Sequence, residues 1–167
     1  MKLTNSLNIK HLLETDWVNQ FNGDQLELIR RGLNNGLNVE AFANPEFNYQ
    51  QMTQISDGLM KDLNVNIYAS PKFSGMKMEY IRRGLEEGYD VSIYADPKFS
   101  WCQMGEILIG LQKGVDVSLF ANPDYEDRQM VMIRNSLVKG YDVTPILDPS
   151  IPYEQMAKWY ESQRGAQ

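Results

Sequence analysis

The sequence has very few of the residues that build catalytic and metal centres. Among its 167 residues there is one histidine, His11, and one cysteine, Cys102. One imidazole cannot form a histidine-rich metal site, and a lone cysteine has no intramolecular disulfide partner and no second histidine that would activate it as a nucleophile. The glycines do not form the GxxxxGK[ST] phosphate-binding loop. We therefore expect no catalytic residue, no metal and no cofactor.

Long apolar runs and positive charge are also scarce. No stretch reaches the roughly 18 apolar residues that a membrane-spanning helix needs. The N-terminal sequence MKLTNSLNIKHLLE lacks the unbroken apolar core of a signal peptide. Together with the single cysteine, this predicts a cytoplasmic protein with no membrane association. The 22 Asp and Glu residues outnumber the 16 Lys and Arg residues, giving a net charge of −6. This balance argues against direct nucleic-acid binding, which requires a basic surface.

What the sequence does have is a pattern of fixed length that starts at an aromatic or apolar residue. The starts are equally spaced, without insertion or deletion: Phe21, Phe47, Phe73, Phe99, Tyr125 and Ile151. Self-similarity with such a period is typical of repeat proteins, whose modules bury their apolar faces against one another. The prediction is a single domain with these parts: a helical cap 1–20, repeats 21–46, 47–72, 73–98, 99–124 and 125–150, and a C-terminal partial repeat 151–167.

The first half of each repeat predicts an α-helix of about 12 residues, since apolar residues recur there at helical spacing. Asn48 with Gln51 shows the spacing of a capping box, which recurs in most copies. A glycine recurs at repeat position 12, where we expect a neighbouring helix to come close. Another glycine at position 16 suits the left-handed residue that ends a helix. Asp62 replaces that second glycine, so we expect the helix of the second repeat to end less regularly.

The second half of each repeat predicts a short helix. In the third copy, Asp90 precedes the apolar run Val-Ser-Ile-Tyr-Ala, and Pro97 stops it. The alternation of this run also fits a β-strand, but the Asp start and the small alanine favour a helix of one or two turns. The fifth repeat departs from the pattern at Glu126 and Pro145. The predicted fold class is an all-α solenoid of six tandem repeats, each with one longer and one short helix.

Alternate copies of the repeat also resemble each other, which gives a second, weaker period twice as long as the first. Even copies carry an aromatic at position 3: Tyr49, Trp101 and Tyr153. Odd copies carry arginine at position 10, with a second arginine beside two of them: Arg30, Arg82 and Arg134, with Arg31 and Arg83. Two interpretations stay open. Each aromatic packs on an arginine of a neighbouring repeat, or these rows form a partner-binding surface, since Trp, Tyr and Arg dominate interface hot spots.

The signature QMxxIRxGLxxGxDVSxYADPxF, matched best by residues 77–99, resembles repeats in proteins of phages and mobile elements from Gram-positive bacteria. This resemblance covers Phe21 to about Tyr160 and implies a mobile-element context, in which small acidic proteins inhibit defence factors such as CRISPR nucleases. We expect a non-catalytic scaffold that binds another protein. One alternative is an acidic mimic of nucleic acid that occupies a basic groove, and another is a weak nucleic-acid binder that uses the arginine and aromatic rows.

Overall fold

The computed structural model describes His11 and residues 13–165, and this part of the chain is entirely helical, without β-strands. Its six α-helices each have 12 residues: α2 (Gly23–Asn34), α3 (Tyr49–Met60), α4 (Gly75–Glu86), α5 (Trp101–Gln112), α6 (Asp127–Val138) and α7 (Tyr153–Arg164). Their starts are equally spaced, about 26 residues apart, which is the period of the repeat in the sequence. The predicted all-α helical repeat with this period is therefore confirmed.

Most of the long helices in the described part begin at capping boxes. The Asn48 side chain accepts a hydrogen bond from the backbone N–H of Gln51 at 2.9 Å, and the Gln51 side chain accepts one from the backbone N–H of Asn48 at 2.8 Å. The same exchange occurs at the starts of α2 and α5. In α4 the Ser74 hydroxyl accepts from the backbone N–H of Lys77 at 3.4 Å, but an ammonium group has no lone pair with which to return the bond.

The long helices α2 to α6 are each followed by a left-handed residue. The glycines at repeat position 16 have positive φ angles of 69° to 78°: Gly36, Gly88, Gly114 and Gly140. Asp62 adopts φ 55° at the same position of the second repeat. Aspartate is one of the few residues with a side chain that tolerates this conformation. α3 has the same length as the other five helices of the described part, but it ends less regularly, as expected. The backbone N–H of Lys61 donates to the carbonyls of Gly58 and Leu59, whereas the N–H of Asn35 after α2 donates to the carbonyl four residues earlier.

The short segments are 3-10 helices, which supports the helical interpretation over the strand. They are η2 (Val39–Ala41), η3 (Val65–Ile67), η4 (Val91–Ile93), η5 (Val117–Leu119) and η6 (Thr144–Ile146). Pro145 lies in the first turn of η6, and the helix there begins one repeat position later than in the other copies. This shift is consistent with proline at the first turn, where a missing N–H has no cost.

The glycine at repeat position 12 makes room for the short helix of its own repeat. A Cβ atom on Gly58 would lie 2.0 Å from the Tyr68 hydroxyl and 2.9 Å from Cγ1 of Val65. Gly32 would meet a phenylalanine and a valine at the corresponding positions. The neighbouring helix that was expected to come close is therefore the 3-10 helix of the same repeat. In the fifth repeat Ser136 replaces the glycine, and Ile146 stands where the other copies have a ring.

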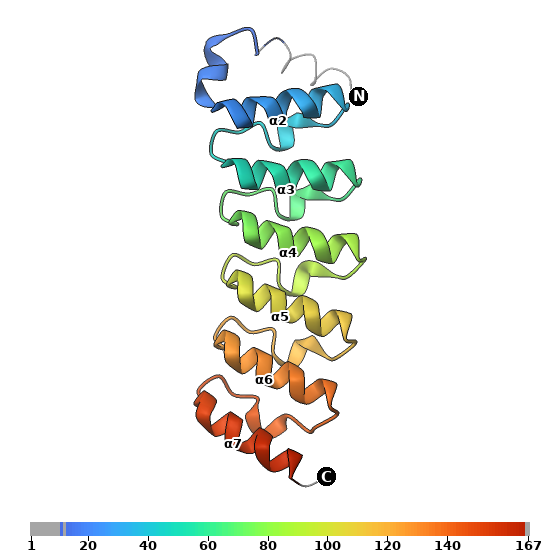
Figure 1. Cartoon of the computed structure of the whole chain (residues 1–167), viewed down its shortest axis with the longest axis vertical. Helices are drawn as coiled ribbons and strands as arrows, with labels where there is room; N and C mark the ends of the chain where they lie inside the picture. The colour runs from blue at the N-terminus through green and yellow to red at the C-terminus, as the bar shows by residue number, and fades with distance from the viewer. Residues whose placement is uncertain (1–10, 12, 166–167) are drawn as a thin grey trace. The chain divides into compact units, whose positions relative to one another are not determined.

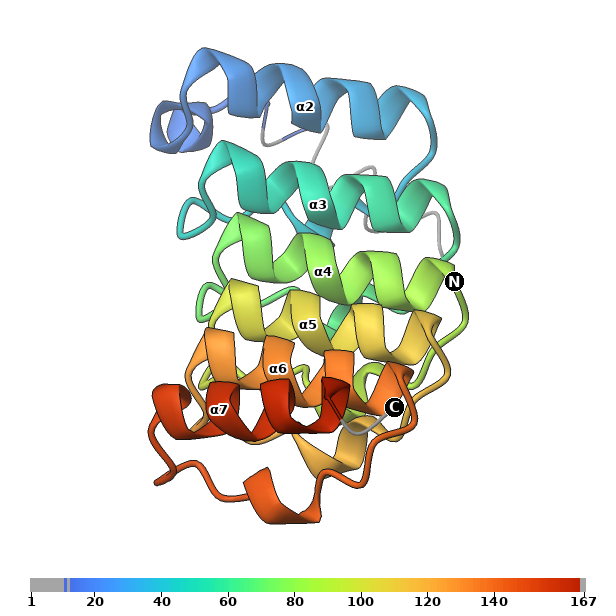
Figure 2. The same cartoon turned by 60° about the horizontal axis from the view of Figure 1, so that its bottom comes forward.

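The chain divides into two compact units, residues 1–88 and 89–167. In the first unit α2, α3 and α4 pack consecutively, and in the second α5, α6 and α7 do so (Figure 1). Within each unit the long helices lie side by side in one layer, and the 3-10 helices connect them (Figure 2). The boundary between the units falls within the third repeat, between α4 and η4.

Buried glutamines tie successive repeats together within each unit. The Gln51 side-chain amide donates to the backbone carbonyl of Phe73, the first residue of the next repeat, at 2.7 Å. Equivalent bonds of 2.6–2.8 Å are made from the other copies: Gln25 to Phe47, Gln103 to Tyr125, and Gln129 to Ile151. The sequence pattern accounts for these glutamines by helix capping alone, so this second role is a finding of the structure.

Most of the predicted N-terminal helical cap falls outside the described residues. Immediately before the first repeat, Asp16–Gln20 form a 3-10 helix, η1, rather than the end of a long α-helix. The Thr15 side chain accepts a hydrogen bond from the backbone N–H of Trp17 at its start. The Trp17 ring lies 4.7 Å from that of Phe21, so this segment contacts the start of the first repeat.

Candidate functional site

The alternating aromatics each occupy the first position of a long helix. Tyr49 is 42% exposed and Trp101 is 45% exposed. Two residues earlier, the aromatics that open each repeat are buried, with Phe47 only 4% exposed. Tyr153 is partly covered, because the guanidinium of Arg128 lies 4.8 Å from the centre of its ring. Tyr49 and Trp101 are therefore large aromatic side chains that core packing leaves at the surface.

Two of the predicted arginines lie in contacts between long helices. Arg82 of α4 donates from Nε to the Gln54 side chain of α3 at 2.8 Å, and it also pairs with Glu86. Arg134 of α6 donates from Nε to the Glu106 carboxylate of α5 at 2.7 Å. Their side chains are only 13% and 14% exposed. The longer sequence period therefore corresponds to a hydrogen-bond donor on the long helix of the third or fifth repeat and an acceptor on the long helix of the repeat before it.

The other predicted arginines lie elsewhere. Arg30 and Arg31 are exposed on α2. Arg83 is half-buried on α4, 5.6 Å from the ring of Tyr80 on the same helix. Tyr153, from the row of aromatics at position 3, does contact an arginine, but this residue is Arg128, which belongs to neither predicted row.

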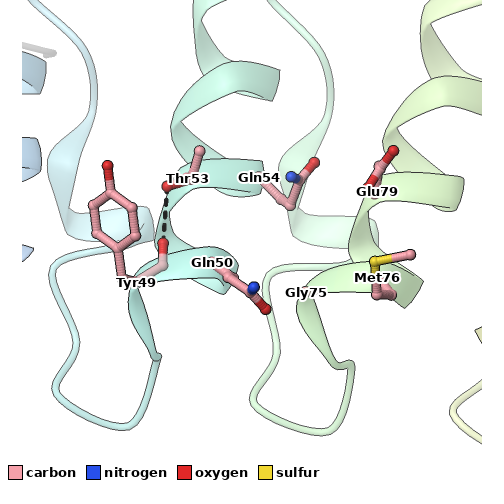
Figure 3. A pocket seen from close by; sticks show the side chains of 7 residues that line it. All are labelled: Tyr49, Gln50, Thr53, Gln54, Gly75, Met76 and Glu79. Carbon is pink, nitrogen blue, oxygen red and sulfur yellow. Dashed lines mark hydrogen bonds between the residues drawn. The ribbon is translucent and has the colours of Figure 1, made fainter.

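A groove of about 180 Å³ lies between the first turns of α3 and α4. Seven residues line it: Tyr49, Gln50, Thr53, Gln54, Gly75, Met76 and Glu79 (Figure 3). Met76 is 41% exposed, close to the exposure of Tyr49. A Cβ atom on Gly75 would lie 2.8 Å from that of Gln50, so glycine lets the two helices approach at this point. Of these seven residues, the sequence indicated Tyr49 alone.

The corresponding region of the second unit is occupied by charged side chains. Asp127 stands at the position of Gly75 and accepts a hydrogen bond from the Ser100 hydroxyl at 2.9 Å. Arg128 stands at the position of Met76 and pairs with Glu126 at 2.6 Å. Burial and the nearby Asp127 carboxylate raise the pKa of the Cys102 thiol. A raised pKa keeps the thiol protonated, which is the opposite of nucleophile activation.

Many carboxylates act as acceptors in turns. Asp90, Asp142 and Asp148 accept hydrogen bonds from backbone N–H groups two residues later, at 2.8–3.1 Å. Hydrogen bonds from Ser92, Thr144 and Ser150 lower the pKa values of these three carboxyl groups. The recurrence of acidic residues at these repeat positions is therefore explained by turn and helix-cap structure.

Neither a metal site nor a known relative adds to this description. Among the described residues, no group of three or more His, Cys, Asp or Glu side chains is placed to hold a metal ion. No helix in that part of the chain is long and apolar enough to cross a membrane. Comparison with family models, curated proteins and solved structures gives no match. The chemistry of the chain's own surface is therefore the basis for a functional proposal.

Proposed function

We propose that this protein is a non-catalytic helical-repeat scaffold that binds another protein through the exposed first turns of its long helices. The observation that carries the proposal is the exposure of Tyr49 and Trp101 at 42% and 45%. Helix capping uses the residues before them, and the buried core uses later residues of the same helices, such as Met52 and Met104. Large aromatic side chains at the surface are the residue types that contribute most to protein–protein affinity.

The resemblance of the repeat signature to proteins of phages and mobile elements suggests what the partner is. We propose that it is a bacterial defence factor, such as a CRISPR nuclease, which this protein inhibits by occupying a surface that the factor needs. The net charge of −6 suits a partner with a basic surface, because charge complementarity speeds association and suppresses wrong partners.

Two other functions receive less support. A mimic of nucleic acid needs a row of acidic side chains free to face a basic groove, whereas Asp90, Asp142 and Asp148 are engaged in turns. Direct nucleic-acid binding through the position-10 arginines needs free guanidinium groups. Arg82 and Arg134 are instead largely buried against neighbouring helices.

The proposal is tested by affinity capture from a lysate of a Gram-positive bacterium, identification of the bound protein by mass spectrometry, and binding assays with that protein after purification. Trp101→Ala should weaken binding by at least tenfold, as expected for a hot-spot residue. Met60→Ala is a matched control, because Met60 is 49% exposed but is the last residue of a long helix, α3, and so lies outside the first turns. A Trp101→Ala protein that melts earlier but binds as tightly as wild type would overturn the proposal.

A further inference from the structure

We propose that the groove between α3 and α4 binds a lysine or arginine side chain from an extended segment of the partner protein. This inference rests on the proposed function and names the chemistry of the partner at one site. The groove combines two exposed apolar side chains, Tyr49 and Met76, with the carboxylate of Glu79. A basic side chain has the matching parts, an apolar stem and a cationic end.

The second unit contains a related contact, made on the side of an equivalent aromatic that faces the preceding repeat, between α6 and α7. The ring of Tyr153, at the first position of α7, receives the guanidinium of Arg128 at 4.8 Å. The carboxylate of Glu154 lies 3.7 Å from the same guanidinium. Tyr49 occupies the equivalent position at the start of α3, but the preceding repeat has Asp24 where Arg128 stands in the fifth. The chain therefore supplies no cation of its own to Tyr49 from that position.

Glu79 is the anionic group available to a cation in this groove. It is half-buried, and within the described residues its carboxylate makes no ion pair or side-chain hydrogen bond. The arginines that follow it on α4 are engaged elsewhere: Arg82 with Gln54 and Glu86, and Arg83 with the ring of Tyr80. A partially desolvated carboxylate without a counterion favours the approach of a positive charge.

The size of the groove fits one side chain. Its volume of about 180 Å³ corresponds to about six water molecules in liquid water. The floor is formed where Gly75 approaches Gln50, and in the second unit Asp127 stands at the position of Gly75. Figure 3 shows Tyr49 on α3 and Met76 and Glu79 on α4, with Gln50 and Gln54 between the two helices. A long side chain that lies across Gln50 and Gln54 can therefore place its charged end near Glu79.

The test is an NMR titration of the ¹⁵N-labelled full chain with three capped tripeptides, Gly-Arg-Gly, Gly-Lys-Gly and Gly-Gln-Gly. We expect the arginine and lysine peptides to shift the backbone amides of Gln50, Gly75 and Glu79, and the glutamine peptide to shift them far less. Glu79→Gln should weaken binding of the basic peptides about fivefold, as expected for loss of a partly exposed ion pair. Glu27→Gln is the matched control, since Glu27 holds the same repeat position on α2 and should leave binding unchanged.

Equal shifts with all three peptides, shifts outside the groove, or equal affinities for the wild type and Glu79→Gln would overturn the inference. Its failure is distinguishable from failure of the proposed function. If Trp101→Ala abolishes binding to the captured protein while Glu79→Gln leaves it unchanged, the proposed function stands and the groove inference falls. If Glu79→Gln weakens binding to that protein and Glu27→Gln does not, both are supported.

Discussion

Arg134 and Glu106 form a hydrogen-bonded ion pair across the interface between α6 and α5, with 2.7 Å between Nε and Oε2. Their side chains are 14% and 18% exposed, so water screens the pair only in part. The first unit has the same geometry with a neutral acceptor, because Arg82 donates to Gln54 at 2.8 Å. What recurs in every second repeat is therefore an inter-helix hydrogen bond, and its acceptor can be charged or neutral.

Replacing Glu106 with alanine should lower the free energy of unfolding by about 1–3 kcal/mol, because it leaves the largely buried guanidinium of Arg134 without its main acceptor. Glu106→Gln should cost about 1 kcal/mol or less, since Gln54 already serves in this role. Urea denaturation measures both. Glu154→Ala is the control, as Glu154 is 70% exposed and its loss should have little effect. Equal losses for Glu106→Ala and Glu154→Ala would contradict this account.

Gly58→Ala should destabilise the protein by about 1–3 kcal/mol through overpacking. The added Cβ would lie 2.0 Å from the Tyr68 hydroxyl, which outweighs the gain of about 1 kcal/mol from the better helix propensity of alanine. In a Tyr68→Ile background the same change should cost less, because the fifth repeat combines Ser136 with Ile146. Thermal denaturation of the four proteins in this double-mutant cycle gives the coupling.

The control for this cycle is Gly23→Ala, because a Cβ there has no neighbouring heavy atom within 4 Å. It should leave the melting temperature unchanged or slightly higher. An equal cost of Gly58→Ala with tyrosine or isoleucine at position 68 would show that contact with the ring is not the cause.

Lys77→Gln should stabilise the protein by about 0.5–1 kcal/mol, because it completes the capping box that Ser74 starts at the beginning of α4. The reverse change in α3, Gln51→Lys, should cost more. It removes both the acceptor for the Asn48 backbone N–H and the donor to the Phe73 carbonyl. Chemical denaturation of the two variants measures the difference. A destabilising Lys77→Gln would contradict the assignment of this residue as an incomplete cap.

Stability should fall as the pH drops below about 4, the ordinary range of aspartate. Hydrogen bonds lower the folded-state pKa values of Asp90, Asp142 and Asp148. A lowered folded pKa gives stability that is present above the unfolded value and is lost as the pH falls through the folded value. Melting temperatures between neutral and acidic pH should therefore decrease less in the triple Asp→Asn variant, in which the amide oxygen still accepts the bond. An unchanged pH dependence would contradict this.

Much of the fold could be predicted from the sequence because the repeat has no insertions. The capping residue Asn48 and the glycine Gly36 act locally, so their pattern defined where helices start and end. The reason for Gly58 could not be predicted, since the contact with Tyr68 depends on how the short helix folds back. Asp62 adopts a left-handed conformation as glycine does, and the hydrogen bonds at the end of α3 are less regular there, as expected from the sequence.

The candidate site was predictable only in part. The alternation drew attention to Tyr49 and Trp101 without deciding between packing and partner binding, and the structure shows that both are exposed. It gave no information on Met76 and Glu79, because their positions vary from copy to copy and only packing of α3 against α4 brings them beside Tyr49. The same alternation placed Arg82 on the candidate surface, whereas its hydrogen bond to Gln54 lies between two helices. The positive charge of an arginine does not indicate whether its side chain lies between two helices, as in Arg82, or on the surface, as in Arg30.

The buried glutamines couple the cap at the start of a long helix to the backbone of the following repeat. In Gln51 one end of the amide holds the Asn48 backbone and the other end holds the carbonyl of Phe73. A chain truncated before Phe73 would lose the hydrogen bond from this amide, at a cost of about 0.5–1.5 kcal/mol, and also the packing of the following repeat. Truncated versions of the protein should therefore unfold first at the new terminus. The smallest fragment that folds on its own should be longer than one repeat.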